Sequence, residues 1–304
     1  MKEGIVLEIK SIFVVGAGLM GSGIAQVAAQ GGYKVCIYDI NEKSLEKALK
    51  TITSSVERFV KKGKLSEMAA QAALANVSTT TKLEDAAKFP FVVEAVFESL
   101  ETKQAVFRKL DGICPPETIL VSNTSGISIS KIASVTGRPE KVAGMHFFAP
   151  VPMMKLVEVI SGIRTSRETM DITVQVGTQM GKEPVRIVKD FGGFIINRVY
   201  LPYIKMSIQV LTEGMVSVDE LDKAVKLGLG YPMGPIELGD MVGWDIMYDA
   251  LNAIYIDTND PSFAPPPLLK RMVDGKVLGK KTGAGFYTYD EAGNRTGVNR
   301  NISI

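Results

Sequence analysis

The chain contains a single histidine, His146, inside the apolar run GMHFFAP. A lone histidine among apolar residues is most often a core residue whose ring nitrogens are hydrogen-bonded. Histidine is also the side chain whose unperturbed pKa lies closest to neutrality, and it is the commonest general acid or base in enzymes. The neighbours of His146 allow both interpretations, so the rest of the chain must decide between them.

Glu158 is a second candidate, because it is the one acidic residue in the otherwise apolar stretch LVEVI. A carboxylate on a buried strand costs free energy unless a partner satisfies it. The single imidazole of His146 is a suitable partner. In return, a carboxylate beside the ring would fix its tautomer and favour the imidazolium that forms when it takes a proton.

A glycine-rich segment, VVGAGLMGSG, follows a short apolar run at residues 12–15 and opens a helical pattern at 19–30. Gly16, Gly18 and Gly21 form the spacing G-x-G-x-x-G. In a dinucleotide-binding fold the first glycine permits a tight turn and the second lets the backbone approach a pyrophosphate. The third allows close helix–strand packing, and the helix N-terminus presents free N–H groups to the phosphates. The spacing alone is a weak signal.

Its context strengthens the signal. The helical pattern ends at Gly31 and Gly32, and a second strand pattern, YKVCIYD, ends at Asp39. A carboxylate there would accept hydrogen bonds from the adenosine ribose hydroxyls and repel the 2′-phosphate of NADP. We therefore expect NAD as the cofactor. The alternative is a surface acid at the end of a strand.

Bulk composition excludes several classes of protein. The 304 residues are 46% hydrophobic and 22% charged, with a net charge of +2, which gives no general argument for binding nucleic acid or a membrane. Residues 11–33 carry no charge, but six glycines and a change from strand to helix pattern argue against a membrane span. Cys36 and Cys114 lack zinc-site spacing and could form one disulfide at most. Reduced thiols in a cytoplasmic protein without a metal site are the simpler interpretation, and we expect them.

Alternating strand and helix patterns predict an α/β fold, with a Rossmann-type, doubly wound and mostly parallel sheet. Strands are predicted at 76–81, 91–97, 118–125, 141–148, 155–160 and 183–190, and helices at 99–111, 128–136 and 166–181. The charged helical stretch 42–75, interrupted at Gly63, is too long for one crossover and predicts a helical hairpin projecting from the sheet.

The pattern becomes helical towards the C-terminus. We therefore expect two domains, a dinucleotide-binding domain at 1–190 and an all-helical domain at 191–304. In open α/β sheets, ligands bind outside the carboxyl ends of the strands, and Ser122–Ser125 and His146 fall there. This placement favours a functional histidine.

Motifs along the whole chain, in order, resemble the L-3-hydroxyacyl-CoA dehydrogenase family, in particular its single-function bacterial 3-hydroxybutyryl-CoA members. These motifs are VGAGLMGSGIAQ, VVEAVFESLETKQAVF, SNTSGISI, MHFFAP, KLVEVI, DFGGFIINR, YPMGPIELGDMVGWDI and GKKTGAGFYTY. The resemblance implies an NAD-dependent oxidoreductase that interconverts (S)-3-hydroxyacyl-CoA and 3-oxoacyl-CoA in fatty acid or butyrate metabolism. It also implies a homodimer or a dimer-based oligomer.

The resemblance also assigns roles to residues. It makes His146 the base towards the 3-hydroxyl group and Glu158 its orienting partner. Ser125 and Asn197 match residues that contact the substrate oxygen. Further matches are cofactor contacts at Glu98, Lys103 and Lys281, and CoA contacts at Ser55 and Lys62, or Lys61 in place of Lys62. Without the resemblance, the lysine cluster at 61–64 would be taken as a solvated helix face.

One position departs from the family pattern near the chemistry. The family usually has asparagine where this chain has Ala149, and that asparagine helps to hold the nicotinamide end of the cofactor. Two alternatives therefore stay open. One is a dehydrogenase of the same fold acting on a longer, dicarboxylic or CoA-free 3-hydroxy substrate, and the other is a non-catalytic nucleotide-binding protein.

Overall fold

A computed structural model describes residues 9–302 of the chain. The chain divides into two compact units, of which the first ends at Phe194 and the second begins at Ile195. The division falls slightly beyond the expected boundary at 190/191, because Phe194 is buried among core residues of the first unit.

The first unit contains one sheet of eight strands in the order β3-β2-β1-β4-β5-β6-β7-β8. All pairs are parallel except β6 and β7, which are antiparallel. The strands are β1 (Ser11–Val15), β2 (Lys34–Tyr38), β3 (Val77–Thr80), β4 (Phe91–Glu94), β5 (Ile119–Ser122), β6 (Val142–Phe147), β7 (Leu156–Ser161) and β8 (Glu183–Ile187). The mostly parallel, doubly wound sheet predicted from the sequence is confirmed.

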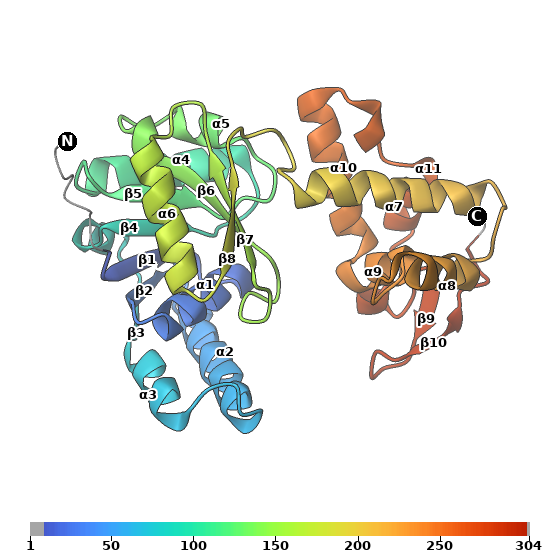
Figure 1. Cartoon of the computed structure of the whole chain (residues 1–304), viewed down its shortest axis with the longest axis horizontal. Coiled ribbons are helices and arrows are strands. Elements are labelled where there is room, and N and C mark those ends of the chain that lie inside the picture. The colour runs from blue at the N-terminus through green and yellow to red at the C-terminus, as the bar shows by residue number, and fades with distance from the viewer. Residues whose placement is uncertain (1–8, 303–304) are drawn as a thin grey trace. The chain divides into compact units, whose positions relative to one another are not determined.

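Helices cover both faces of this sheet, as Figure 1 shows. Alternate residues of β1 point to opposite faces, so Ile12 and Val14 pack in one core cluster and Phe13 and Val15 in the other. The helices on the first face are α1 (Leu19–Gln30) and α6 (Arg167–Gln179), and those on the second face are α4 (Leu100–Ile113) and α5 (Ile129–Ala133). Because both faces are buried, the central strands are mostly apolar, with polar residues such as Glu94 and Ser122 at their carboxyl ends.

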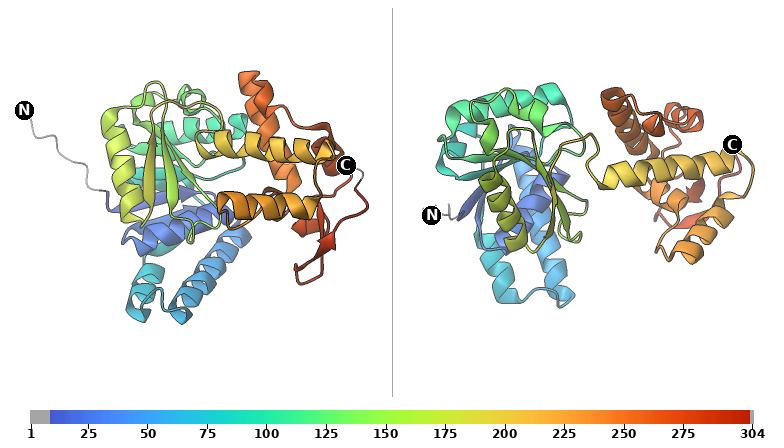
Figure 2. Two further views of the ribbon diagram at one scale, coloured as in Figure 1. Left: turned by 45° about the vertical axis from the view of Figure 1, so that its right-hand side comes forward. Right: turned by 45° about the horizontal axis from the view of Figure 1, so that its top comes forward.

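The charged stretch at 42–75 forms the predicted helical hairpin, α2 (Glu42–Lys61) and α3 (Glu67–Ala75), which projects from the sheet in Figures 1 and 2. Asn41 and Ser66 cap the two helices by accepting backbone N–H groups, as polar residues at N-cap positions commonly do. Gly63 takes a φ of +64° in the turn, a conformation that favours glycine.

The second unit is mainly helical. Its helices are α7 (Ile196–Thr212), α8 (Val218–Leu229), α9 (Pro235–Val242), α10 (Trp244–Thr258) and α11 (Pro267–Asp274). They pack around a core centred on Trp244, which is fully buried and meets Phe286 edge-on at 5.1 Å between ring centroids. Short 3-10 helices occur in this unit at Pro261–Phe263 and Lys280–Thr282, and in the first unit at Leu83–Lys88 and Pro139–Lys141.

One antiparallel hairpin corrects the expectation of an all-helical C-terminal domain. It joins β9 (Tyr287–Tyr289) to β10 (Arg295–Val298). Its turn is built by Asp290, whose carboxylate accepts from the backbone N–H of Asn294, and by Gly293 at a φ of +78°. Such Asp-x-x-Gly turns favour a hairpin over a continued helix.

Within residues 9–302, no helix combines the length and the apolar character that crossing a membrane requires. Both cysteines, Cys36 and Cys114, are buried free thiols.

Candidate active site

His146 and Glu158 lie directly opposite each other on the antiparallel strands β6 and β7. The Nδ1 atom of His146 lies 2.7 Å from Oε2 of Glu158. Both residues are buried, with 5% and 1% of their surface exposed. The pairing that the acid in LVEVI suggested is therefore present. Since Nδ1 faces the carboxylate, Nε2 is the ring nitrogen left for exchanging a proton with a ligand.

Aromatic rings enclose the imidazole of His146. The ring of Phe148 lies 4.5 Å away and that of Phe194 5.9 Å away, measured between centroids. Asn123, at the end of β5, accepts a 2.9 Å hydrogen bond from the backbone N–H of Phe147. The imidazole thus has a fixed place at the carboxyl end of β6, where α/β folds bind their ligands.

The three motif glycines serve different needs. A Cβ atom on Gly16 would lie 2.6 Å from the carbonyl oxygen of Ala95, and one on Gly21 would lie 1.8 Å from that of Gly16. Both positions therefore exclude a side chain for reasons internal to the fold. A Cβ on Gly18 would meet nothing within 4 Å. Gly18 borders open space at the N-terminus of α1, as a glycine does where a ligand approaches the backbone.

Asp39 follows β2 and is joined to the glycine loop. Its Oδ2 atom accepts a 2.9 Å hydrogen bond from the backbone N–H of Ala17, and Oδ1 accepts one from Asn41. The acid that the sequence predicts as the ribose partner is thus fixed beside the loop that would hold the pyrophosphate. Together, the open space at Gly18 and the carboxylate of Asp39 fit a dinucleotide such as NAD.

Ser125 follows β5 and belongs to a hydrogen-bonded network that includes two glutamates and a lysine. Glu98 accepts a 2.7 Å hydrogen bond from the backbone N–H of Ser125 and a 2.6 Å bond from the hydroxyl of Thr124. The ammonium of Lys103 lies 3.3 Å from Glu98 and donates to Glu94 at 2.8 Å. The structure therefore connects Glu98, Lys103 and Ser125, three of the predicted site residues.

Lys103 and Glu94 form a fully buried ion pair, with side chains 1% and 0% exposed. Glu94 also accepts from the hydroxyl of Ser122 and the backbone N–H of Val96. The buried ammonium of Lys103 therefore binds mainly to groups of the protein itself. The side chain of Glu98, by contrast, is 44% exposed and accessible to a ligand. Sequence reasoning missed Glu94, although it shows the same signal as Glu158, one acid in an apolar strand.

The remaining predicted residues lie elsewhere. Lys62 is exposed at the end of α2, but Ser55 is 8% exposed and packs on the buried side of that helix. Asn197 and Lys281 belong to the second unit, where Asn197 lies in the first turn of α7. The ammonium of Lys281 lies 2.5 and 2.6 Å from the two carboxylate oxygens of Asp245.

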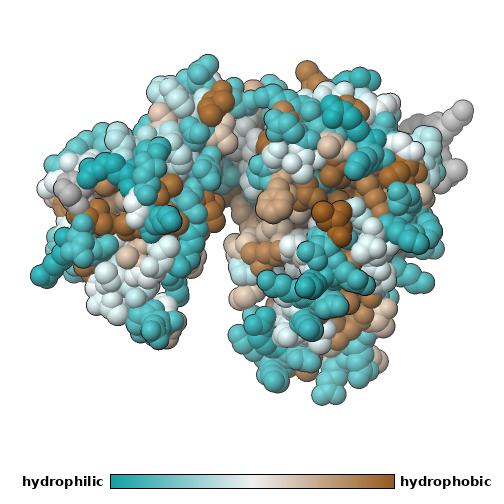
Figure 3. Space-filling model, turned by 180° about the vertical axis from the view of Figure 1, so that it is seen from behind, coloured by the Kyte–Doolittle hydropathy of each residue, from teal (hydrophilic) through white to brown (hydrophobic). Residues whose placement is uncertain are grey.

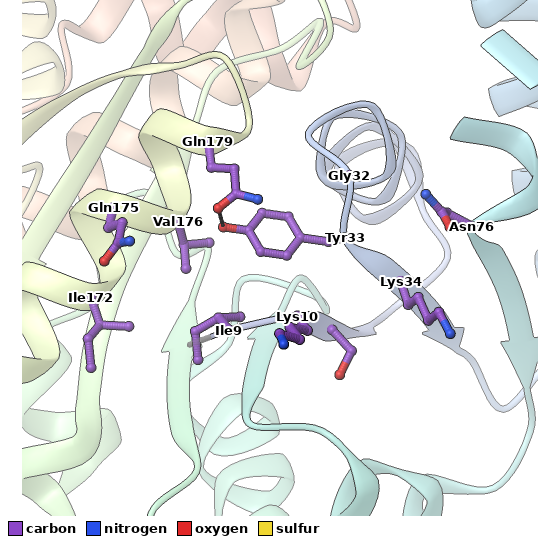
Figure 4. A pocket seen from close by; sticks show the side chains of 11 residues that line it. Ile9, Lys10, Gly32, Tyr33, Lys34, Asn76, Ile172, Gln175, Val176 and Gln179 are labelled. Carbon is purple, nitrogen blue, oxygen red and sulfur yellow. Dashed lines mark hydrogen bonds between the residues drawn. The ribbon is translucent and has the colours of Figure 1, made fainter. Parts of the chain in front are cut away.

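A cavity of about 520 Å³ lies at the opposite end of the strands, beside the first residues of β1 and β2 (Figure 4). The hydroxyl of Tyr33 donates to Oε1 of Gln179 across it. Its lining includes Lys10, Lys34 and Gln175. Because His146 stands at the carboxyl end of β6, this cavity is separate from the candidate site.

The fold and the glycine loop define a dinucleotide-binding protein with a second, helical unit. The family description "3-hydroxyacyl-CoA dehydrogenase, NAD binding domain" matches residues 11–191, and "3-hydroxyacyl-CoA dehydrogenase, C-terminal domain" matches residues 193–289. The chain belongs to the 3-hydroxyacyl-CoA dehydrogenase family, an NAD-dependent class of enzymes.

Similar proteins come from bacteria and mammals. A probable 3-hydroxybutyryl-CoA dehydrogenase of Bacillus subtilis is 44% identical over 94% of this chain and 99% of its own length. A mitochondrial hydroxyacyl-coenzyme A dehydrogenase of Rattus norvegicus is 44% identical over 92% of this chain and 91% of its own. The crystal structure of (S)-3-hydroxybutyryl-CoA dehydrogenase from Ralstonia eutropha has a TM-score of 0.90 and 40% identity, covering 93% of this chain and 100% of that one.

Proposed function

We propose that this enzyme interconverts (S)-3-hydroxybutyryl-CoA and acetoacetyl-CoA, using NAD, with His146 and Glu158 as its acid/base pair. The observation that carries the proposal is the 2.7 Å contact between Nδ1 of His146 and Glu158 at the carboxyl end of β6. The substrate assignment is supported by the names of the similar proteins from Bacillus subtilis and Ralstonia eutropha.

The cofactor would be held by the glycine loop and Asp39. The open space at Gly18 would admit the pyrophosphate, and Asp39 would accept the ribose hydroxyls. The exposed carboxylate of Glu98 is a candidate for a further ribose contact, with Lys103 holding it from inside. When bound, NAD supplies the hydride chemistry, because it takes the hydride of the substrate carbon and NADH returns it.

The protein residues would move the proton. In the oxidation direction, Nε2 of His146 takes the proton of the 3-hydroxyl group, and Glu158 stabilises the resulting imidazolium through Nδ1. In the reduction direction, the imidazolium returns that proton to the substrate oxygen. Ser125 and Asn197 would donate hydrogen bonds to the same oxygen. Acid/base assistance of this kind contributes roughly 10²–10⁴-fold to the rate.

The CoA moiety would bind along the helical hairpin. Lys62, exposed at the end of α2, supplies a cation for the phosphates of CoA, and Lys61 stands beside it. Ser55 is the weaker of the proposed CoA contacts, because its side chain packs towards the protein. Lys281 would reach the cofactor only in competition with its ion pair to Asp245.

We also propose that the enzyme is a cytoplasmic homodimer assembled through its helical unit. Large apolar side chains are exposed on α8, α10 and the α7–α8 connection, namely Met215, Leu227, Leu229, Ile246 and Ile256. Figure 3 shows hydrophobic residues scattered among hydrophilic ones over the visible face of the molecule. Large exposed apolar side chains would be covered if they lay in an interface between two subunits.

The direct test is consumption of NADH with acetoacetyl-CoA near neutral pH, with wild type and His146→Gln in parallel. NADPH and free acetoacetate serve as controls for cofactor and substrate. We expect NADH-dependent turnover with the CoA ester, lost roughly 10²–10⁴-fold in the variant while the fold and NADH binding persist. Equal activity in the two proteins would return His146 to a structural role.

The same assay separates the alternatives. Turnover of free acetoacetate as fast as that of its CoA ester would favour a CoA-independent 3-hydroxy acid dehydrogenase. NADH binding without turnover of any 3-oxoacyl compound would favour a non-catalytic nucleotide-binding protein, and Ala149 would then be the first position to restore to asparagine.

A further inference from the structure

Lys182 is a buried cation that none of the proposed catalytic steps uses. It lies between α6 and β8 and is 7% exposed. Its ammonium donates hydrogen bonds to the backbone carbonyl of Val151 at 2.5 Å and to that of Met154 at 2.8 Å. Within residues 9–302 its ammonium makes no ion pair with a carboxylate. A buried ammonium that donates its hydrogen bonds to the carbonyls of one loop anchors that loop.

The anchored segment is the loop 148–155, which joins β6 to β7. Its other side packs on the helix of the glycine motif, because a Cβ on Gly23 in α1 would lie 2.8 Å from Cβ of Val151 and 3.6 Å from Cδ of Pro152. Inside the loop, the backbone N–H groups of Met153 and Met154 donate to the carbonyl of Pro150. The loop is thus clamped between α1 and Lys182.

The same loop carries residues that meet the candidate acid/base pair. Phe148, its first residue, places its ring 4.5 Å from the imidazole of His146. Ala149, the position at which this chain departs from the family pattern, follows it directly. Any displacement of the loop would therefore move a wall of the histidine site and the cofactor helix relative to each other.

We propose that Lys182 is a positioning residue. Its buried ammonium holds the loop 148–155 against α1 and thereby keeps Phe148 on His146 and the cofactor side of the site in place. The first part of this inference concerns the protein alone, and the part about cofactor binding rests on the proposed function.

The acceptors of Lys182 are neutral carbonyls, so no carboxylate offsets the cost of burying its charge. Burial lowers the pKa of Lys182 to about 8, and opening of the loop would return that pKa towards about 10.4. The protonated form therefore favours the open loop, and the closed loop gains stability as pH rises through about 8.

Other charged groups lie near the clamp in the described part of the chain. Lys155 and Glu183 pair with each other at 3.5 Å and are largely exposed, and Glu158 contacts His146. Arg186 of β8 pairs with Asp171 of α6 at 2.6 Å, α1 contains no charged residue, and those of α6 lie in its first half.

The test compares Lys182→Met with Lys182→Arg, and takes Lys155→Met as the matched control, because Lys155 is an exposed lysine at the end of the same loop. Hydrogen exchange of the amides of residues 148–155 is measured in the ligand-free proteins, and NADH affinity by fluorescence titration. For Lys182→Met we expect exchange about tenfold faster and NADH binding about tenfold weaker, the effect of one lost charge-assisted hydrogen bond. Lys182→Arg should restore much of both, and Lys155→Met should change neither.

The pH dependence of NADH affinity in the wild-type protein gives a second test, which needs no substitution. Its NADH affinity should rise between pH 7 and pH 9.5 as the closed loop becomes more stable, whereas Lys182→Arg, whose guanidinium stays charged, should show no such rise over that range. Unchanged loop exchange and unchanged NADH affinity in Lys182→Met would overturn the proposal. A wild type that binds no NADH at all would refute the proposed function, and the exchange measurement would still decide whether Lys182 anchors the loop.

Discussion

Buried carboxylates occur in both units, but they meet different partners. Glu158 in the first unit contacts the imidazole of His146, a group that can gain and lose a proton. Asp240 in the second unit accepts from the indole N–H of Trp244, from the backbone N–H groups of Phe286 and Tyr287, and from the hydroxyl of Tyr289. The partners of Asp240 are structural groups that do not titrate near neutral pH.

Asp222 repeats the second pattern. It accepts from the backbone N–H groups of Ile236 and Glu237 and from the hydroxyl of Tyr287. Burial raises the pKa of both Asp222 and Asp240, and the surrounding donors oppose that rise. Burial of an acid therefore does not by itself mark a catalytic site. A titratable partner at a ligand-binding edge of the fold is the more specific sign.

Glu158→Gln should give the largest loss of activity. It tests the acid that has a titratable partner. The isosteric amide keeps the volume but no longer supports the imidazolium, so we expect kcat with acetoacetyl-CoA to fall roughly 10²–10⁴-fold. The melting temperature should change little. Steady-state kinetics and thermal unfolding check both expectations, with the exposed Glu183→Gln as the control. An unchanged kcat would place Glu158 with the structural acids.

Asp240→Asn should lower the stability of the protein and leave its activity unchanged. The amide cannot accept from all four donors, and each buried donor left without an acceptor costs about 1–3 kcal/mol. We expect a clear loss in the free energy of unfolding, measured by denaturant titration, and an unchanged kcat per folded molecule at low temperature. A variant of normal stability with low kcat would contradict the division between the two kinds of acid.

The glycine loop offers the same contrast on a smaller scale. Gly18→Ala should weaken NADH binding about tenfold, the effect of about 1.4 kcal/mol, because its Cβ enters the open space at the helix N-terminus. The ligand-free protein should unfold at the same temperature as wild type. Gly21→Ala should lower that temperature, because its Cβ would overlap the carbonyl of Gly16. Equal effects of the two substitutions on unfolding would remove the distinction.

Lys182 is a buried cation, and its titration should give the smallest of these effects, a change of melting temperature with pH. Its pKa is lowered to about 8 in the folded protein and lies near 10.4 in an unfolded chain. Between these values the unfolded state binds more protons, so the stability contributed by this group rises with pH. The melting temperature of wild type relative to Lys182→Met should therefore increase from pH 7 to pH 9, by roughly 2–4 °C. A constant difference would argue that Lys182 is solvated.

Much of the fold follows from sequence patterns. The strand–glycine–helix start and the hairpin broken at Gly63 follow from local spacing. The pair formed by His146 and Glu158 follows from the need of a buried acid for a partner. The structure contains each of them. The antiparallel placement of β7 does not follow, because the alternation of side chains along a strand is the same in either direction. The hairpin of β9 and β10 was missed because its strands are short.

The site was harder to predict where side chains act through others. Lys103 is a cofactor candidate in the sequence, yet its main partner is Glu94, a residue that only the folded sheet brings near it. Ser55 shows a signal that was available. It shares the helical stripe of Leu45, Ala48, Ile52 and Val56, so its burial follows from the spacing of residues along α2.

Trp244 is the only tryptophan of the chain, and it lies buried in the second unit with its indole N–H on Asp240. Tryptophan emission will therefore report on the helical unit alone, without a label or a substitution. Its wavelength should shift to the red when that unit opens, even if the sheet of the first unit remains intact. Bound NADH absorbs in the same spectral region as the indole emits, so quenching by energy transfer would report the separation of the two units in solution.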